Sequence, residues 1–371
     1  MKVALIHDHL AQDGGAEKVL KVIADLFPDA PIYTLLYEKK NADKYFKHRT
    51  IQTSIIQRLP GGIKYYKWFM PWMPMAVEFF NLSDFDLVIS DTSSFAKGVI
   101  TNTKTLHICY CHTPTRYLWS DTHSYIEELR FNKYFKKLIA LSLNKIRIWD
   151  RVAADRVDIF LANSQFIARR ISKYYRRDST VIYPPINLSD FQISSDLGDY
   201  FLAGGRLVPY KRFDLLIKVF KANGKRLRIF GDGPDTGRLR ALAEGVANIE
   251  FLGRVSEPEK IALYSRAQAF INPQEEDFGI TMVESLASGR PVIAYQAGGA
   301  SEIVTPDCGL LFAEQSAASL QTALDHFSVA NFNSTAIRAS AQRFSEDLFK
   351  QKFQAFINEA MLKHKSENSH L

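Results

Sequence analysis

The sequence predicts an α/β protein with two domains, each built on a parallel sheet that helices cover on both faces. Short apolar runs of strand length alternate with stretches whose apolar residues recur at helical spacing. The length of 371 residues also favours two domains. A double proline, Pro184-Pro185, separates two series of these alternating segments and marks the expected boundary.

The first half opens with a strand over 3–6, a turn at Asp13-Gly14-Gly15 and an amphipathic helix over 16–27. Glycines at such a turn let a ligand approach the backbone beside the electropositive start of the helix. The GxGxxG spacing is missing, so a plain tight turn is an equal alternative. Further strands are expected at 31–36, 86–90, 106–111, 158–162 and 181–183, and helices at 130–157 and 164–175.

His112 follows the apolar strand over 106–111 directly. It therefore lies at the carboxyl end of a parallel strand, where ligands and catalytic groups gather in this class of fold. A structural histidine is the alternative interpretation.

The second half repeats the alternation. A glycine-led basic loop over 205–212 follows the strand over 201–204, and a helix then runs to about residue 222. The string GDGPDTG at 231–237 has GxGxxxG spacing and no acid at the position of a ribose contact, so we reject a dinucleotide cofactor. The remaining strands are expected at 228–231, 249–252, 269–272 and 291–294, and a last helix at 345–363, before a frayed tail.

The stretch over 267–289 has the order strand, acidic loop, helix, with Gly289 at the position of a C-cap glycine. Glu276 belongs to the loop and Glu284 to the helix. Two carboxylates beside a helix start suit a ligand with many hydroxyl groups and a phosphate, because carboxylates accept hydrogen bonds and the helix end attracts anions. An acidic loop with one exposed helical glutamate is the alternative.

Composition and charge narrow the classes of partner. The chain is 46% hydrophobic and 23% charged, as in globular proteins, and its net charge of +7 favours nucleotides, phosphates, nucleic acid or an anionic membrane surface. We find no nucleic-acid motif and expect no such partner. Three cysteines without a CxxC pair, no signal peptide and no membrane-spanning run lead us to expect a cytoplasmic protein.

Residues 64–80, KYYKWFMPWMPMAVEFF, combine lysines with many aromatic residues. This composition favours a segment at a membrane interface or one that grips a lipid-linked ligand. The alternative is a helical insertion with an ordinary core, in which Pro71 and Pro74 break any long helix. The basic helix over 130–157 has either a solvated face or a face turned towards anionic lipid.

Several motifs resemble the retaining glycosyltransferases of family 4: GRLVPYKRFDLLI, GDGP, FLGRVS and EEDFGITMVESLASGRPVIA. HDHLAQDGGAEKVL, YCHTPTRYLWS, RVDIFLANS and VIYPP resemble the bacterial branch with mannosyltransferases of surface-polysaccharide assembly. One departure is DCGLLF at 307–312, where the family has a TG-L-F pattern. The resemblance implies the glycosyltransferase-B fold, with two Rossmann-like domains facing each other across a cleft. Residues 1–183, with the last helix at about 345–371 packed back on them, would take the acceptor, and residues 184–344 the nucleotide-sugar.

The same resemblance implies roles for individual residues. Arg206 and Lys211 would hold the diphosphate and stabilise it as it leaves, and Glu276 would bind the transferred sugar beside the backbone of Phe278, Gly279 and Ile280. Glu284 would bind the ribose, and Gly14 and Gly15 would approach a phosphate. His112 would contact the sugar or the reacting centre, and Arg254 and Val255 would lie near the base.

The resemblance further implies transfer of a hexose, with GDP-mannose as the favoured donor and a lipid-linked saccharide at the cytoplasmic face of the inner membrane as acceptor. We see no DxD-like cluster and expect no metal requirement. We can nominate no protein nucleophile. We therefore favour attack by the acceptor on the same face of the sugar from which the phosphate departs. The alternatives are a UDP-hexose donor, such as UDP-glucose or UDP-galactose, and a nucleotide-sugar epimerase.

Overall fold

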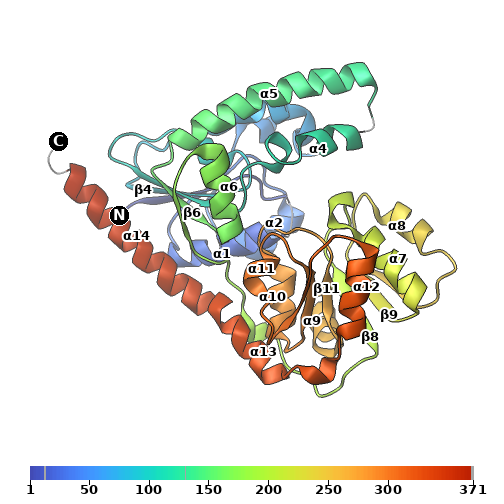
Figure 1. Cartoon of the computed structure of the whole chain (residues 1–371). Coiled ribbons are helices and arrows are strands. Elements are labelled where there is room, and N and C mark those ends of the chain that lie inside the picture. Colours follow the sequence, from blue (N-terminus) through green and yellow to red (C-terminus); the bar gives the residue numbers. More distant parts are fainter. Residues whose placement is uncertain (12–13, 130, 369–371) are drawn as a thin grey trace. The chain divides into compact units, whose positions relative to one another are not determined.

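The structure, a computed structural model, describes residues 1–11, 14–129 and 131–368. Asp13 of the expected turn and the last three residues of the expected tail lie outside this part. The chain divides into two compact units (Figure 1). Unit 1 comprises Met1–Tyr183 with Phe349–Leu371, and unit 2 comprises Pro184–Leu348.

Unit 1 contains a seven-stranded sheet in the order β3-β2-β1-β4-β5-β6-β7, and all its described strand pairs are parallel. The strands are β1 (Val3–His7), β2 (Ile32–Thr34), β3 (Ile51–Thr53), β4 (Leu87–Thr92), β5 (Leu106–Cys111), β6 (Ile159–Ala162) and β7 (Ser179–Val181). The helices are α1 (Gly15–Leu26), α2 (Lys39–Phe46), α3 (Met73–Glu78), α4 (Thr122–Glu128), α5 (Lys133–Asp155), α6 (Gln165–Tyr175) and α14 (Glu346–Asn368).

Both faces of this sheet are covered by apolar side chains. Val3 and Leu5 of β1 belong to one core cluster, whereas Ala4 and Ile6 belong to another. Successive side chains of a strand point to opposite faces, so the two clusters lie on the two sides of the sheet. Burial on both faces explains why the strands are continuous apolar runs.

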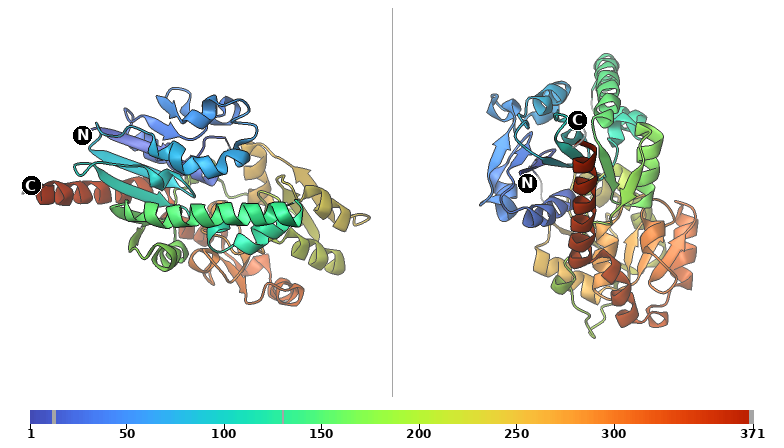
Figure 2. Two further views of the ribbon diagram at one scale, coloured as in Figure 1. Left: turned by 90° about the horizontal axis from the view of Figure 1, so that it is seen from above. Right: turned by 90° about the vertical axis from the view of Figure 1, so that its left-hand side faces the viewer.

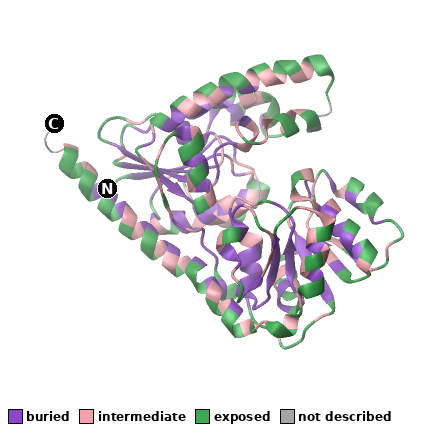
Figure 3. Cartoon of the chain, viewed as in Figure 1, coloured by how far each residue is buried: buried purple, intermediate pink, exposed green. Residues whose placement is uncertain are grey.

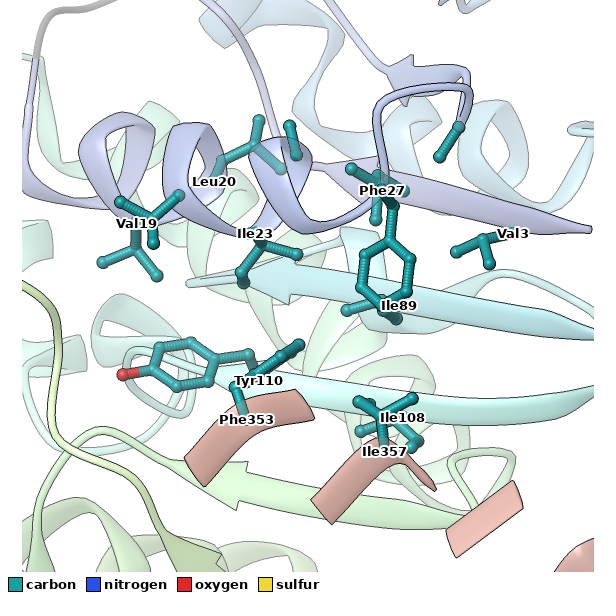
Figure 4. Close-up of a cluster of buried hydrophobic side chains, with 14 of the residues drawn as sticks. Val3, Val19, Leu20, Ile23, Phe27, Ile89, Ile108, Tyr110, Phe353 and Ile357 are labelled. Carbon is teal, nitrogen blue, oxygen red and sulfur yellow. The ribbon is translucent and has the colours of Figure 1, made fainter. Parts of the chain in front are cut away.

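The helix α14 brings the end of the chain back to unit 1. Its buried residues Phe349, Phe353 and Ile357 belong to the same core cluster as β1 and α1. Figure 4 shows Phe353 and Ile357 beside Tyr110 and Ile108 of β5. Burying a phenylalanine or isoleucine side chain contributes roughly 1.5–3 kcal/mol, so these contacts anchor α14 on the sheet.

Unit 2 contains a six-stranded sheet in the order β10-β9-β8-β11-β12-β13, again with parallel pairs throughout its described part. The strands are β8 (Tyr200–Gly204), β9 (Arg226–Phe230), β10 (Ile249–Gly253), β11 (Phe270–Asn272), β12 (Val292–Tyr295) and β13 (Gly309–Phe312). The helices are α7 (Phe213–Asn223), α8 (Thr236–Leu242), α9 (Glu257–Arg266), α10 (Ile280–Ala287), α11 (Ala300–Ile303), α12 (Ala317–His326) and α13 (Ser334–Ser340).

The predicted α/β class with parallel sheets is confirmed in both units. Strand β3 was not predicted, because its three residues, IQT, are only partly buried and form no apolar run. Strand β13 was not predicted either; it contains most of the DCGLLF stretch and lies at the edge of its sheet.

Each sheet has one point where the strand order reverses. In unit 1 the reversal lies between β1 and β4, and in unit 2 between β8 and β11. Connections from the two central strands leave in opposite directions there and open a crevice at their carboxyl ends, where ligands bind in doubly wound folds. The fold therefore indicates two candidate ligand sites, one in each unit.

Two further segments of unit 1 bear on function. Residues 64–80 form a 3₁₀ helix, η2 (Tyr66–Trp72), and the short α3, with Pro71 inside the first and Pro74 near the start of the second. The prediction that these prolines prevent a long helix is confirmed. Helix α5 instead runs unbroken for 23 residues, as the view from above in Figure 2 shows. None of the described helices is both long and apolar enough to cross a bilayer.

Candidate active site

In unit 2, Lys211 and Glu276 meet at the carboxyl edge of the two central strands. Lys211 ends a short 3₁₀ turn, Pro209–Lys211, after β8, and Glu276 lies in the loop after β11. The ammonium Nζ of Lys211 lies 2.7 Å from Oε1 of Glu276, and the amide Nε2 of Gln274 donates to the same oxygen at 2.7 Å. The two charged side chains are 12% and 16% exposed, so the pair is largely shielded yet reachable from solvent.

Two glycines shape the loop that carries Glu276. Gly279, the residue before α10, has φ of +110°, a conformation that favours glycine. Gly298 lies against the backbone of Glu276. A Cβ at position 298 would lie 2.1 Å from the carbonyl oxygen of Glu276. The N–H of Gly299 donates to that carbonyl at 2.8 Å. The loop is thus tied to the segment after β12, which fixes the position of the glutamate.

Two arginines at this edge are open to solvent. Arg206 follows β8, is exposed, and makes no hydrogen bond or ion pair with any residue that the structure describes. Arg254 follows β10, is 85% exposed, and has its Nε 3.5 Å from Oδ2 of Asp232. Val255 beside it is half-buried. These guanidinium groups can bind an anion without first losing a buried partner.

Glu284 has a different partner from Glu276. It lies in α10 with a side chain only 5% exposed, and its Oε1 is 2.9 Å from Nζ of Lys260 on α9. Lys260 also contacts Glu257 at 3.0 Å. Burial alone would lower the pKa of Lys260, but the two carboxylates outweigh it and raise that pKa. A ligand hydroxyl at Glu284 would therefore meet a carboxylate that is already ion-paired.

The side chains of Phe278 and Ile280, between Glu276 and Glu284, have a packing role. Phe278 is buried, and its ring packs edge-on against Phe344 with 5.5 Å between centroids. Ile280 is the first residue of α10 and is half-buried. The predicted contribution of 278–280 through the backbone is compatible with this, because the N–H groups at the start of α10 have no carbonyl partner within the helix.

In unit 1, one carboxylate holds two histidines at the carboxyl edge. Asp91 of β4 is fully buried; its Oδ2 lies 2.8 Å from Nδ1 of His7, which ends β1, and its Oδ1 lies 2.7 Å from Nε2 of His112. His112 is 12% exposed, whereas His7 is 4% exposed. Asp91 therefore fixes the ring of the more accessible histidine.

The charges of this cluster depend on one another. Burial alone would lower the pKa of His7, but the hydrogen bond and charge of Asp91, aided by Glu17 and Asp8, raise it to about 9. Burial would raise the pKa of Asp91, but His112 and His7 hold it below its usual value. His7 is therefore an imidazolium and Asp91 a carboxylate at neutral pH.

The predicted glycines stand at the start of α1. Gly14 is the N-cap residue, and its N–H donates to the carboxylate of Glu17 at 3.0 Å. Burial raises the pKa of Glu17, which lies within the electrostatic reach of His7. Gly15 begins the helix. The loop after β4 is held separately, by Asp8, which accepts backbone N–H bonds from Ser93, Phe95 and Ala96.

The structure thus joins the predicted site residues into smaller groups. Lys211 pairs with Glu276, and Glu284 pairs with Lys260. His112 and His7 both pair with Asp91. From the sequence we assigned no role to His7, Asp91, Lys260 or Gln274, which the structure places in these groups. Asp91 directly follows the strand predicted at 86–90, and Lys260 lies in a helix that the capping box of Ser256 and Glu259 announces. Those two signals could have identified Asp91 and Lys260.

No group of three or more described histidine, cysteine or acidic side chains could hold a metal ion. All three cysteines are free and buried. The expected independence of metal stays a prediction.

Two family profiles match the chain almost end to end. The profile described as Glycosyltransferase Family 4 matches residues 13–190, and the one described as Glycosyl transferases group 1 matches residues 191–342. The chain belongs to the family 4 glycosyltransferases. The resemblance seen in the motifs is therefore confirmed.

Among relatives of this chain, the O-antigen chain mannosyltransferase of Salmonella typhimurium is 32% identical over 165 residues, 42% of this chain and 47% of that protein. The GDP-mannose-dependent monoacylated alpha-(1-6)-phosphatidylinositol monomannoside mannosyltransferase of Corynebacterium glutamicum is 36% identical over 131 residues, 32% of this chain and 34% of that protein. The chain spans about half the length of the first curated relatives it matches.

Solved structures resemble the glycosyltransferase over nearly its whole length. The Anabaena protein HepE in complex with UDP-glucose covers 97% of this chain and 100% of its own, with a TM-score of 0.72 and 18% sequence identity. At this identity the likeness concerns the fold alone, and it establishes the glycosyltransferase-B fold.

Proposed function

We propose that this chain is a retaining glycosyltransferase that moves a mannosyl group from GDP-mannose to a lipid-linked saccharide. The observation that carries the proposal is the ion pair of Lys211 and Glu276 at the strand-order reversal of unit 2. It sets a cation and a carboxylate side by side where a doubly wound fold binds its ligand. A nucleotide-sugar requires this combination, because its diphosphate is anionic and its sugar is rich in hydroxyl groups.

The reaction would depend mainly on stabilising the leaving group. As the bond between sugar and phosphate breaks, negative charge grows on the diphosphate and positive charge on the sugar ring. Lys211 and the exposed Arg206 would bind the diphosphate, and the N–H groups at the start of α10 would add partial positive charge. Glu276 would bind sugar hydroxyls, which would join or displace the donors now on its Oε1.

We assign the donor to unit 2 and the acceptor to unit 1. In unit 2, Glu284 would bind ribose, and Arg254 with Val255 would lie near the base. In unit 1, His112 would contact the transferred sugar or the reacting centre, while Gly14 and Gly15 would approach a phosphate. The support for His112 is that Asp91 holds its ring in one orientation at the carboxyl edge.

We favour mannose and GDP because the relatives of Salmonella typhimurium and Corynebacterium glutamicum carry mannosyltransferase names. The lipid-linked acceptor implies work at the cytoplasmic face of a membrane, with the protein attached peripherally.

Nucleotide binding tests the donor. The full chain is heated with GDP or with UDP at matched concentrations, and the melting temperature is recorded. A ligand at about 100 times its Kd stabilises the folded state by about 2.7 kcal/mol, so the preferred nucleotide gives a clear upward shift. We expect GDP to raise the melting temperature more than UDP. A shift with UDP alone would replace GDP-mannose by a UDP-hexose, and isomerisation of a free nucleotide-sugar without acceptor would make the protein an epimerase.

A further inference from the structure

Helix α5 carries large apolar side chains on two opposite faces. Leu143, Ile146 and Ala153 are buried against the core of unit 1. Five other apolar residues are 55% to 72% exposed and follow one another at intervals of four, three, seven and four residues. With 3.6 residues per turn, these intervals align them along the side of the helix opposite the buried residues. This α5 stripe consists of Tyr134, Leu138, Leu141, Ile148 and Val152.

The stripe is unusual for a helix on the surface of a water-soluble unit. Such a helix normally turns polar residues outward. Figure 3 shows exposed residues at intervals along α5. The stripe residues are among them, since each is more than half exposed. Several large exposed apolar side chains on one face of a helix mark a site of contact with a protein or a membrane.

The charges of α5 decide between these partners. The helix carries six basic residues and two acidic ones. Of the acids, Asp150 is buried against Lys97, and Asp155 is paired with Arg151 at 2.6 Å. Lys145 stands within the stripe itself. A second copy of α5 would bring like charges together, whereas an anionic lipid surface attracts each basic residue that lies near it.

An apolar cavity of about 300 Å³ adjoins the first turns of the stripe. Its walls come from η2, α4 and α5, and Leu138 belongs both to the cavity and to the stripe. The ring of Trp68, which is 60% exposed, lies 6.0 Å from that of Phe131 and 5.9 Å from that of Phe135. Lys67 is the one charged residue in the described lining. The cavity can therefore take a hydrocarbon segment, with a cation nearby for an anionic headgroup.

We propose that the α5 stripe and this cavity form a surface that binds an anionic lipid bilayer. The stripe would lie in the plane of the interface, as amphipathic helices with basic flanks do. Lys137 and Lys145 would reach the headgroups, and the cavity would hold part of one acyl chain of a membrane lipid. The inference rests on the proposed function only in that a lipid-linked acceptor is met at a membrane; binding itself requires no sugar transfer.

Vesicle binding without donor or acceptor tests the proposal. The full chain is sedimented with vesicles of phosphatidylglycerol or of phosphatidylcholine. We expect strong partitioning onto the first and weak partitioning onto the second. The double variant Leu138→Ser, Ile148→Ser should lower the partition coefficient on phosphatidylglycerol at least about tenfold, because each side chain loses its apolar contact with lipid.

The matched control is Leu362→Ser, which removes a leucine that is 71% exposed on the other 23-residue helix, α14. It should bind vesicles as the parent chain does, and all three proteins should melt alike. The pair Lys137→Glu, Lys145→Glu should abolish the preference for phosphatidylglycerol.

Equal binding by the parent chain and the double variant would overturn the proposal, as would absence of binding by the parent chain. A dimer seen by light scattering and lost in the double variant would overturn it in favour of self-association. Vesicle binding that persists in a chain without transferase activity would refute the proposed function and leave this surface standing.

Discussion

The carboxyl edges of the two sheets share one topology and differ in their charge and burial. In unit 1 the edge is filled by acids and histidines that satisfy one another: Asp91 holds His7 and His112, and Asp8 accepts backbone N–H groups of the loop after β4. In unit 2 the edge carries cations of two kinds: Lys211 is largely shielded and paired with Glu276, whereas Arg206 and Arg254 are exposed.

The contrast shows how one fold serves two tasks. Groups already paired and buried cannot respond much to a ligand, so the edge of unit 1 is suited to hold one side chain, that of His112, in a fixed place. The exposed guanidinium groups of Arg206 and Arg254 keep their capacity for an anion, so the edge of unit 2 fits the diphosphate of the proposed donor. The two edges should therefore respond differently to mutation, the first mainly in stability and the second mainly in turnover.

The largest effect should come from Asp91→Asn. The amide keeps the shape but removes the buried charge that keeps His7 protonated. Loss of one partner of a buried ion pair costs roughly 3–5 kcal/mol, and we expect about 3 kcal/mol because His7 can release its proton. For a unit of this size the melting temperature should fall by roughly 6–12 °C.

The control for this variant is Asp155→Asn in the same unit. Its carboxylate is 56% exposed and pairs with Arg151 on the surface of α5. Exposed pairs contribute little, so its melting temperature should stay within about 2 °C of the parent. Equal losses in the two variants would show that the buried cluster is no more important than a surface pair.

Lys211→Ala should leave the fold intact and lower turnover. If the ammonium stabilises the leaving diphosphate, its removal should reduce kcat by roughly 10²-fold, equivalent to about 2.7 kcal/mol. Initial rates with the preferred donor provide the measurement. Lys218→Ala, on an exposed position of α7, is the matched control and should turn over normally. Near-normal turnover of Lys211→Ala would contradict the expectation that mutations at the edge of unit 2 act mainly on turnover.

The fold could be predicted because its information is local. The strands buried on both faces appear as apolar runs, and proline or glycine separates them from the helices that follow. The alternation alone then implies parallel sheets. Strand β3 escaped because it depends on pairing with β2 for its existence and has no apolar signature.

The site could be predicted only in part, because its contacts join residues far apart in the chain. The end of a predicted strand identified His112, and the acidic loop between a predicted strand and helix identified Glu276. Lys211 was identified by the family resemblance alone. Partners were not identified, because 84 residues separate His7 from Asp91 and 24 separate Lys260 from Glu284. Sequence separation says nothing about which side chains register across a sheet or between helices.

The smallest of the three effects is a loss of stability with rising pH, which His7 should cause. Its pKa is about 9 in the folded chain against about 6.5 in an unfolded one. Because the folded pKa is raised, the contribution to stability is full below about pH 6.5 and disappears as the pH rises through about 9. Between pH 7 and pH 9 linkage gives a loss of about 2 kcal/mol.

The variant His7→Asn separates this effect from general alkaline sensitivity, and the native His107 provides an internal comparison. His107 is also buried in unit 1, but burial, aided by Arg156, lowers its pKa to about 3, so it is neutral throughout this window and adds no slope. His7→Asn keeps an N–H donor towards Asp91 without a titrating group. Its melting temperature should therefore start lower at pH 7 and fall less by pH 9 than that of the parent. An equally steep fall in both proteins would assign the slope to other groups and leave the charge on His7 without a role in holding the edge of unit 1 together.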